Sequence, residues 1–176
     1  MRTNVILTVV GSDRPGLVQA VADAVLAVDG NWLESHLAHL AGKFVGAVLV
    51  EVPPARLADL ESRLRKTDAA GLQVTLVDAP SPPTDAAGRL VALELVGQDR
   101  PGIVREVTAA LAGRKVNIED FATELAHGSW SGERLFRAKA TLRVPPAVAL
   151  DSLRETLERL SAELMVDLNL TETDKG

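Results

Sequence analysis

Two stretches of the chain repeat one combination of glycine, acid, arginine and proline. Residues 10–18 read VGSDRPGLV and residues 96–104 read VGQDRPGIV, so that Gly11 returns as Gly97 after 86 residues. Each stretch follows an apolar run and precedes an apolar pattern of helical period, which predicts a turn from a strand into a helix. Backbone N–H groups at a helix start lack intrahelical partners and carry partial positive charge, so this turn can hold a small carboxylate. Its glycines let a ligand approach the backbone closely.

The same turn also has a purely structural interpretation. Asp13 is a suitable N-cap, and Pro15 suits the first helical turn, where its missing N–H costs little. One copy alone is explained equally well as a helix start. Two copies at the same place favour a functional role, although duplication can also copy a structural turn.

An asparagine follows each predicted helix, Asn31 in the first copy and Asn117 in the second. An amide offers a donor and an acceptor, which suits a zwitterion that carries an ammonium and a carboxylate group. The alternative is a turn residue that tolerates a left-handed backbone. For a single asparagine this alternative is favoured, and the binding role gains weight once the asparagine is paired with the glycine turn.

The elements around these turns follow the order strand, helix, strand, strand, helix, strand. In the first copy we predict strands at 5–10, 31–41, 44–52 and 72–77, and helices with the apolar spacings Leu17-Val21-Val25 and Leu57-Leu60-Leu64. The loosely alternating second strand is expected at a sheet edge. The continuously apolar third strand is expected at the centre.

The second copy repeats this order and carries about six additional residues near 127–134, which predict a longer hairpin loop. We predict one domain at 1–78, a linker at 79–88, a second domain at 89–171 and a tail at 172–176. The predicted fold class is α+β, with two ferredoxin-like βαββαβ modules in tandem, each with both helices on one face of an antiparallel sheet. The other face needs a cover, and we expect the two modules to cover each other.

Composition limits the classes of function. A net charge of −5 and an aromatic content of 3% argue against direct binding of DNA or RNA. The absence of cysteine excludes disulfides, thiolate catalysis and cysteine zinc sites. We expect a cytoplasmic protein that does not bind membranes, because a reducing compartment fits this composition and neither a signal peptide nor a membrane-spanning apolar stretch is found.

Patterns for catalysis and metal binding are weak. The three histidines are His36, His39 and His127, and the first two would face opposite sides of a strand. Carboxylates are scattered along predicted helix faces, and neither a Gly-x-Ser-x-Gly elbow nor a phosphate-binding P-loop is found. We therefore predict a protein that is not an enzyme, with no cofactor and no metal site.

The repeated residues resemble a known family. Gly-x-Asp-Arg-Pro-Gly followed by Leu or Ile and Val, with the asparagine that follows each helix, is similar to ACT domains, which are small ligand-binding regulatory modules of ferredoxin-like fold. The likeness covers nearly the whole chain. Members of the family commonly bind amino acids where the first strand–helix turn meets a neighbouring module. The resemblance therefore implies these ligand contacts: Gly11, Asp13, Gly16 and Asn31, and Gly97, Asp99, Gly102 and Asn117.

The resemblance also implies a function. Two ACT domains without an enzyme domain are similar to transcriptional repressors of the glycine cleavage system. This implies a sensor of a small amino acid, such as glycine or serine, that controls a partner protein such as a transcription activator. We also expect a homo-oligomer, and we expect the two sites to differ, since only the second copy has the longer loop. The alternative is an interaction module without a ligand, in which the sheets serve dimerisation and the turns only start helices.

Overall fold

The computed structural model describes residues 1–12, 14–68, 71–79, 87–127 and 134–172. The chain separates into two compact units, Met1–Thr84 and Asp85–Gly176, which we call module 1 and module 2. Each module has its own four-stranded sheet and its own cluster of buried apolar side chains. Each therefore folds around side chains from its own half of the chain.

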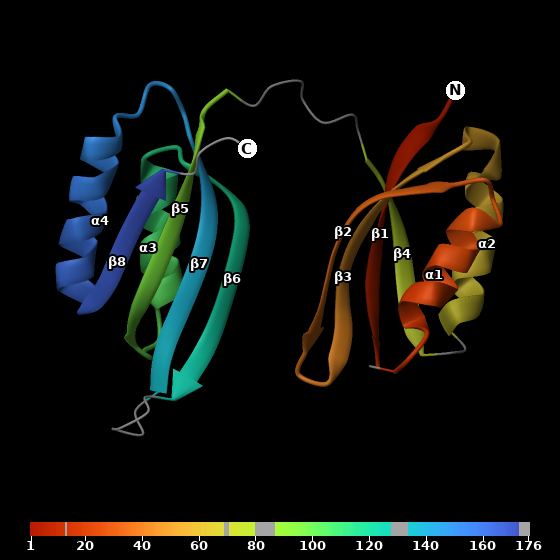
Figure 1. Ribbon diagram of the computed structural model, residues 1–176, viewed down its shortest axis with the longest axis horizontal. Coiled ribbons are helices and arrows are strands. Elements are labelled where there is room, and N and C mark those ends of the chain that lie inside the picture. Colours follow the sequence, from red (N-terminus) through yellow and green to blue (C-terminus); the bar gives the residue numbers. More distant parts are fainter. Residues whose placement is uncertain (13, 69–70, 80–86, 128–133, 173–176) are drawn as a thin grey trace. The chain divides into compact units, whose positions relative to one another are not determined.

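Module 1 is an antiparallel sheet with two helices on one face (Figure 1). Its elements are β1 Thr3–Ser12, α1 Leu17–Leu26, β2 Asn31–Leu40, β3 Lys43–Val52, α2 Leu57–Asp68 and β4 Leu72–Asp78, with a short 3₁₀ turn at Pro54–Arg56. The strand order is β2-β3-β1-β4, so β2 lies at an edge and β3 lies inside the sheet, as predicted.

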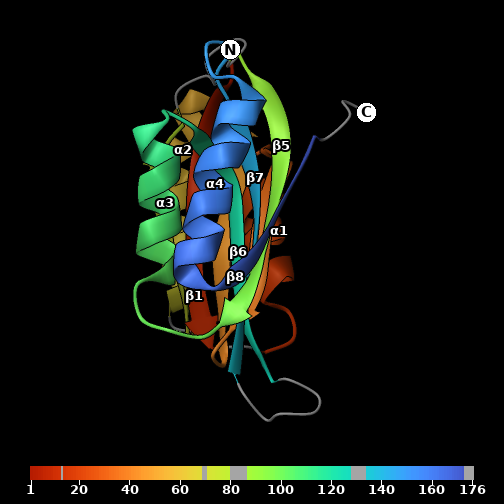
Figure 2. The ribbon, with the colours of Figure 1, turned by 90° about the vertical axis from the view of Figure 1, so that its left-hand side faces the viewer.

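Module 2 repeats this arrangement with the strand order β6-β7-β5-β8. Its elements are β5 Arg89–Gln98, α3 Ile103–Gly113, β6 Asn117–His127, β7 Arg134–Val144, α4 Leu150–Leu164 and β8 Val166–Glu172. Figure 2 shows α3 and α4 side by side on one face of this sheet. The predicted tandem of ferredoxin-like βαββαβ modules is confirmed.

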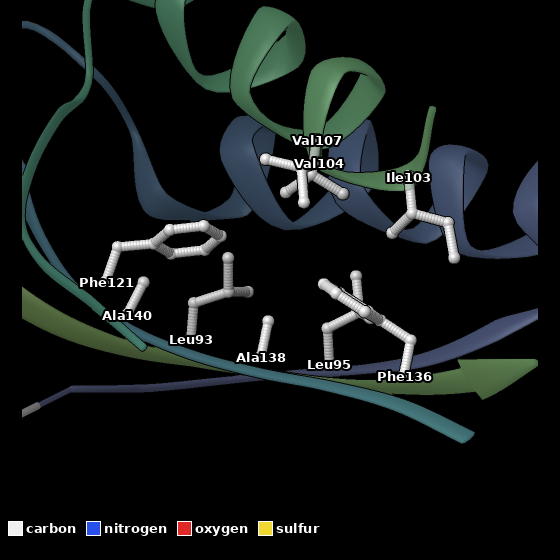
Figure 3. Close-up of a pocket in the computed structure, with 9 residues that line it drawn as sticks. All are labelled: Leu93, Leu95, Ile103, Val104, Val107, Phe121, Phe136, Ala138 and Ala140. Atoms are coloured by element: carbon white, nitrogen blue, oxygen red, sulfur yellow. The ribbon is translucent and has the colours of Figure 1, made fainter. Parts of the chain in front are cut away.

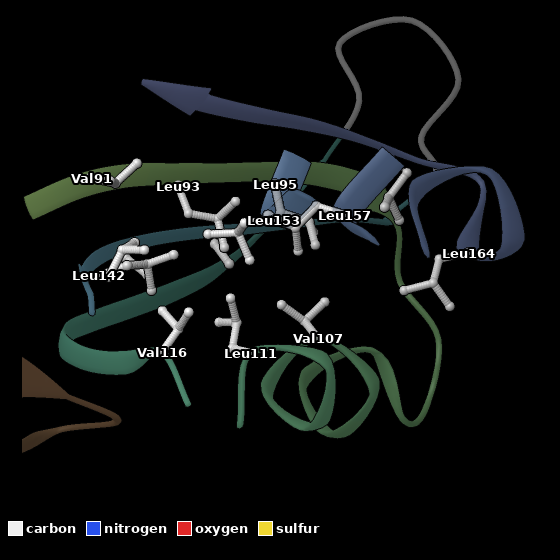
Figure 4. Close-up of a cluster of buried hydrophobic side chains, with 14 of the residues drawn as sticks. Val91, Leu93, Leu95, Val107, Leu111, Val116, Leu142, Leu153, Leu157 and Leu164 are labelled. Carbon is white, nitrogen blue, oxygen red and sulfur yellow. The ribbon is translucent and has the colours of Figure 1, made fainter. Parts of the chain in front are cut away.

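Strand alternation decides which side chains enter each core. In β1, Val5, Leu7 and Val9 point toward the helices and are buried, whereas the alternate residues Thr8 and Val10 are exposed on the opposite face. Apolar residues at helical spacing on the two helices pack against these strand residues, as Figure 4 shows for module 2. There the buried cluster includes Leu93, Leu95, Val107, Leu111, Leu153 and Leu157. Both helices of a module are thus used on one sheet face, and the other face carries no helix.

The structure corrects several details of the sequence analysis. The N-cap of α1 is Gly16 rather than Asp13, and Pro15 lies before the helix. Asp13 itself lies outside the described residues, as do residues 128–133 of the longer loop. At the C-terminus, β8 continues through Glu172, where a tail was expected, because its register with β5 pairs Glu172 with Val91.

Candidate functional site

The turn after β1 ends in a glycine with a left-handed backbone, which opens the start of α1. Gly16 has φ +91° and makes no side-chain cap. The first N–H bonded within the helix is that of Ala20, which donates to the Gly16 carbonyl oxygen at 3.0 Å. The N–H groups of residues 17–19 therefore lie outside the helical ladder. Among the described residues, a Cβ built on Gly16 would have no atom within 4 Å, so the space beside Gly16 is open.

The turn after β5 has the same backbone but a different neighbour. Gly102 has φ +96°, and the N–H of Glu106 donates to its carbonyl oxygen at 3.0 Å. The Glu106 carboxylate lies over this helix start, with Oε1 3.5 Å from a Cβ built on Gly102, and forms an ion pair with Arg100 at 2.8 Å. Module 1 has Ala20 at the position of Glu106. The chain thus places the Glu106 carboxylate at the second turn, where the first has the methyl group of Ala20.

Asp99 ties the second turn to the sheet. Its N–H donates to the Arg134 carbonyl oxygen at 3.0 Å, and its carboxylate lies 3.4 Å from the Arg134 guanidinium. The backbone N–H of Asp99 is therefore used by the chain itself. This arrangement joins the turn to the first residue of β7.

Gly11 and Gly97 have a packing reason for being glycine. A Cβ on Gly11 would lie 2.8 Å from the Gly71 carbonyl oxygen, and a Cβ on Gly97 would overlap the side chain of Val166. Both glycines are buried within their sheets, paired with the first residues of β4 and β8. Close approach of neighbouring strands explains these two positions without a ligand.

The two predicted asparagines do not lie beside the glycine turn of their own module. Asn31 pairs with Glu51, which pairs with Asn4 of β1, whereas the turn begins at Ser12. Eight residues of strand separate these places, which is roughly 26 Å at about 3.3 Å per residue. One small ligand cannot contact both groups within one module.

The left-handed residues at the ends of α1 and α3 lie two positions before the asparagines. Asp29 has φ +57° and Lys115 has φ +56°, and these two positions are again 86 residues apart. Asn31 and Asn117 instead begin strands β2 and β6. The interpretation that the asparagines adopt a left-handed backbone was therefore wrong. The left-handed turn is present in both copies, but it lies two residues before each asparagine.

Asn117 belongs to a polar cluster with Glu119 and Arg143. The Asn117 amide and the Arg143 guanidinium each donate to Glu119 Oε1 at 2.9 Å. The hydrogen bond from Asn117, followed by that from Arg143, holds the pKa of the Glu119 carboxyl below its ordinary value of 4.5. Asn117 thus already has an acceptor for its amide.

Lys43 is a cation at the turn of module 1 that sequence reasoning missed. It begins β3, pairs with Ser12 across the sheet, and donates from Nζ to Ser12 Oγ at 3.1 Å. Ser12 and Lys43 are 31 positions apart in the sequence, so their contact is not evident from the sequence alone. The contact follows from the register of β1 against β3, because the antiparallel pairing of these strands brings Ser12 and Lys43 together.

An apolar cavity in module 2 lies beside α3 (Figure 3). Its lining includes Ile103 and Val104 of α3, Phe121 of β6 and Phe136 of β7, and its volume is about 10 Å³. This is room for about one water molecule, which the wholly apolar lining does not favour. The cavity is a packing gap and is too small for an amino acid.

Metal-binding clusters and membrane spans are not found in the described part of the chain. Among those residues, no group of histidine and carboxylate side chains could hold a metal ion. Within the same residues, the longest and most apolar helices fall short of what crossing a bilayer requires.

A family model for the ACT domain matches the chain twice, at residues 3–77 and at residues 89–171. The chain belongs to the ACT domain family. Both matches include the glycine turn, so the turns of α1 and α3 occupy equivalent places in two ACT domains. Among curated proteins, no relative matches this chain.

Two solved structures are similar to this chain over nearly its whole length. A protein of unknown function from Galdieria sulphuraria is 29% identical, with a TM-score of 0.86 over 98% of this chain and 99% of that one. A protein named "putative glycine cleavage system transcriptional repressor" is 19% identical, with a TM-score of 0.75 over 99% of each chain. The second likeness shows a shared fold.

Proposed function

We propose that this tandem ACT protein is a regulatory sensor of a small amino acid, and that it controls a partner protein rather than catalysing a reaction. The observation that carries the proposal is the open start of α1. There, three backbone N–H groups follow the left-handed Gly16, which has no side chain of its own to cap them. A ligand carboxylate on these groups would gain hydrogen bonds and a favourable helix dipole.

In this proposal module 1 holds the ligand more tightly than module 2. Its helix start has no acidic residue in the first turn, and Lys43 lies next to Ser12. In module 2, a ligand carboxylate would have to displace or repel Glu106, which already lies at the helix start and is paired with Arg100. Like charges at one anion site lower affinity.

The proposed ligand is glycine or serine, and the proposed partner is a transcription activator of glycine cleavage genes. Support comes from the ACT family membership and from the likeness to the named repressor. The contacts we assign to the ligand in module 1 are the Gly16 turn and the N–H groups that follow it. Asn31, at the far end of its module, joins the proposed site only through a second copy of the chain.

A charge swap between the two turns tests the proposal. Isothermal titration of the wild-type protein with glycine and with serine is expected to show binding. Ala20→Glu copies the acid of module 2 into module 1 and is expected to weaken that binding about tenfold or more. Glu106→Ala copies module 1 into module 2 and is expected to strengthen the weaker site. Flat titrations of ligand-free wild-type protein with all common amino acids would overturn the sensor.

A second candidate function is an interaction module without a ligand. The packing reasons for Gly11 and Gly97 favour it, because they explain half of the repeated glycines without a bound molecule. Flat titrations of the wild-type protein would leave this candidate, whereas binding that is unchanged in Ala20→Glu and Glu106→Ala would place the ligand away from the two turns.

A further inference from the structure

The sheet faces that carry no helix differ sharply between the two modules. In module 1, the central strands β1 and β3 present Ile6, Thr8, Val10, Val45, Ala47 and Leu49 on this face. At the equivalent register positions, β5 and β7 of module 2 present Ala92, Glu94, Val96, Arg137, Lys139 and Thr141. None of these six residues is charged in module 1, whereas three of the six are charged in module 2.

The charges of module 2 are arranged as cross-strand pairs. Glu94 faces Lys139 in register, with 3.3 Å between the charged atoms, and Glu124 faces Arg137 at 3.8 Å. Opposite charges directly across an antiparallel ladder stabilise the sheet and keep its surface in water. This face is suited to solvent, because burying these charges against an apolar surface would carry a large desolvation cost.

The face of module 1 has an apolar centre and a polar border. Val10 and Val77 are 47% and 48% exposed. In the central row, the Thr8 hydroxyl donates to the Thr75 carbonyl oxygen at 3.4 Å, which satisfies its donor within the sheet. The charged groups lie at the border, where Glu34 and His36 contact each other on the edge strand β2 and Lys43 lies at the end of β3. Protein interfaces have this anatomy of apolar core and polar rim.

We propose that the helix-free face of module 1, centred on Thr8, Val10, Val45 and Ala47, is a dimer interface that takes the same face of a second copy of this chain. Two apolar faces of one kind are complementary, and neither has to desolvate a central charge. Four strands about 4.8 Å apart and nine residues long give roughly 500 Å² per face, or about 1,000 Å² for the pair. That area reaches the lower size of a specific interface.

The geometry of such a dimer follows from sheet packing. Two twisted sheets pack face to face about 10 Å apart, with their strands at about 30° to each other. A two-fold axis through the centre of the face brings each copy's Thr8 and Ala47 row against its counterpart, where small side chains allow close approach. The interface is isologous, so assembly stops at two chains. This inference does not rest on the proposed ligand.

Module 2 supplies the substitutions that test the interface. Thr8→Glu with Ala47→Lys installs in module 1 the cross-strand pair that Glu94 and Lys139 form at the same register. The pair is compatible with this fold, so the double variant is expected to stay folded by circular dichroism. It is expected to raise the dimer dissociation constant about 100-fold or more in sedimentation analysis, because two charges would be buried at the interface.

The matched control is the reverse change, Glu94→Thr with Lys139→Ala, which is expected to leave the dimer intact. A second variant, Ala38→Glu with Val45→Arg, copies the Glu124–Arg137 pair and covers the case in which the first misfolds. It too is expected to dissociate the dimer. A monomeric wild type at high micromolar concentration, or a dimer insensitive to both charged variants, would overturn the proposal. So would dissociation by the reverse variant alone.

Discussion

Glycine occupies two kinds of position in the repeated turn, and the two have different physical reasons. Gly16 and Gly102 adopt positive φ, where any larger residue would strain the backbone; Gly16 lies in open space and Gly102 lies beside the Glu106 carboxylate. Gly11 and Gly97 lie outside the left-handed region and are needed because neighbouring strands come too close for a Cβ. The first kind shapes the candidate site, and the second kind holds β4 and β8 against the centre of each sheet.

We expect Gly97→Ala to lower the free energy of unfolding by about 1–3 kcal/mol, because the new methyl group overlaps Val166. Urea denaturation followed by circular dichroism measures this change. Gly113→Ala is the control, since a Cβ at this last residue of α3 would have no atom within 4 Å. It is expected to be neutral or to stabilise by up to about 1 kcal/mol. Equal losses in both variants would contradict the packing argument.

The edge strands β2 and β6 carry a bulge at equivalent places. The register of β2 against β3 shifts between Trp32 and Glu34, and that of β6 against β7 shifts between Ile118 and Asp120. The extra residues are Leu33 and Glu119. In module 2, Asn117 and Arg143 hold the bulged Glu119 through hydrogen bonds to its carboxylate. A polar cluster thus fixes an irregularity in the sheet.

The pH dependence of stability reports on this bulge. A carboxyl whose pKa is lowered by folding stabilises the fold above its unfolded pKa, and this contribution is lost as pH falls through the folded value. The hydrogen bonds from Asn117 and Arg143 lower the pKa of Glu119 below 4.5. Glu119→Gln is therefore expected to cost stability at pH 7 and to converge with wild type in acid. Urea unfolding at both pH values measures this, with Glu155→Gln on the exposed face of α4 as the control. A difference that persists unchanged in acid would contradict it.

The sequence predicted the elements better than it predicted the site. Periodic apolar residues such as Leu17, Val21 and Val25 fixed the helices, because burial of one face dominates their stability. The cap was misassigned because Gly16 ends the turn through its backbone alone, with no side-chain hydrogen bond. The separation of Asn31 from the turn was implied by topology, since α1 carries the chain back along the sheet. The Ser12–Lys43 contact required the register between β1 and β3.

At the scale of the whole molecule, the two copies have kept the backbone and changed the surfaces. At the helix start, module 1 has Ala20 where module 2 has the acid Glu106. On the helix-free sheet face, module 1 has Thr8 and Ala47 where module 2 has the charged pair Glu94 and Lys139. The proposed sensor and the proposed dimer therefore both place the specialised surface in module 1.

Ligand binding at one module should raise the apparent stability of the chain in a concentration-dependent way. A site present only in the folded state stabilises it by about 2.7 kcal/mol when the ligand exceeds its dissociation constant 100-fold. We expect glycine or serine to raise the melting temperature of wild type, and Ala20→Glu to need more ligand for the same rise. Differential scanning calorimetry measures both. A melting temperature that is unchanged by glycine and by serine up to millimolar concentration would contradict the proposed sensor function.

The bulges in β2 and β6 also bear on how this protein behaves when it is concentrated. A bulged edge presents a broken row of N–H and C=O groups, so it is a poor template for a strand from another molecule. Fibril elongation needs such a template. A sheet face that binds its own copy about a two-fold axis is instead fully occupied once the dimer has formed. Filaments that grow through the edge strands β2 and β6 are therefore not expected in concentrated solutions.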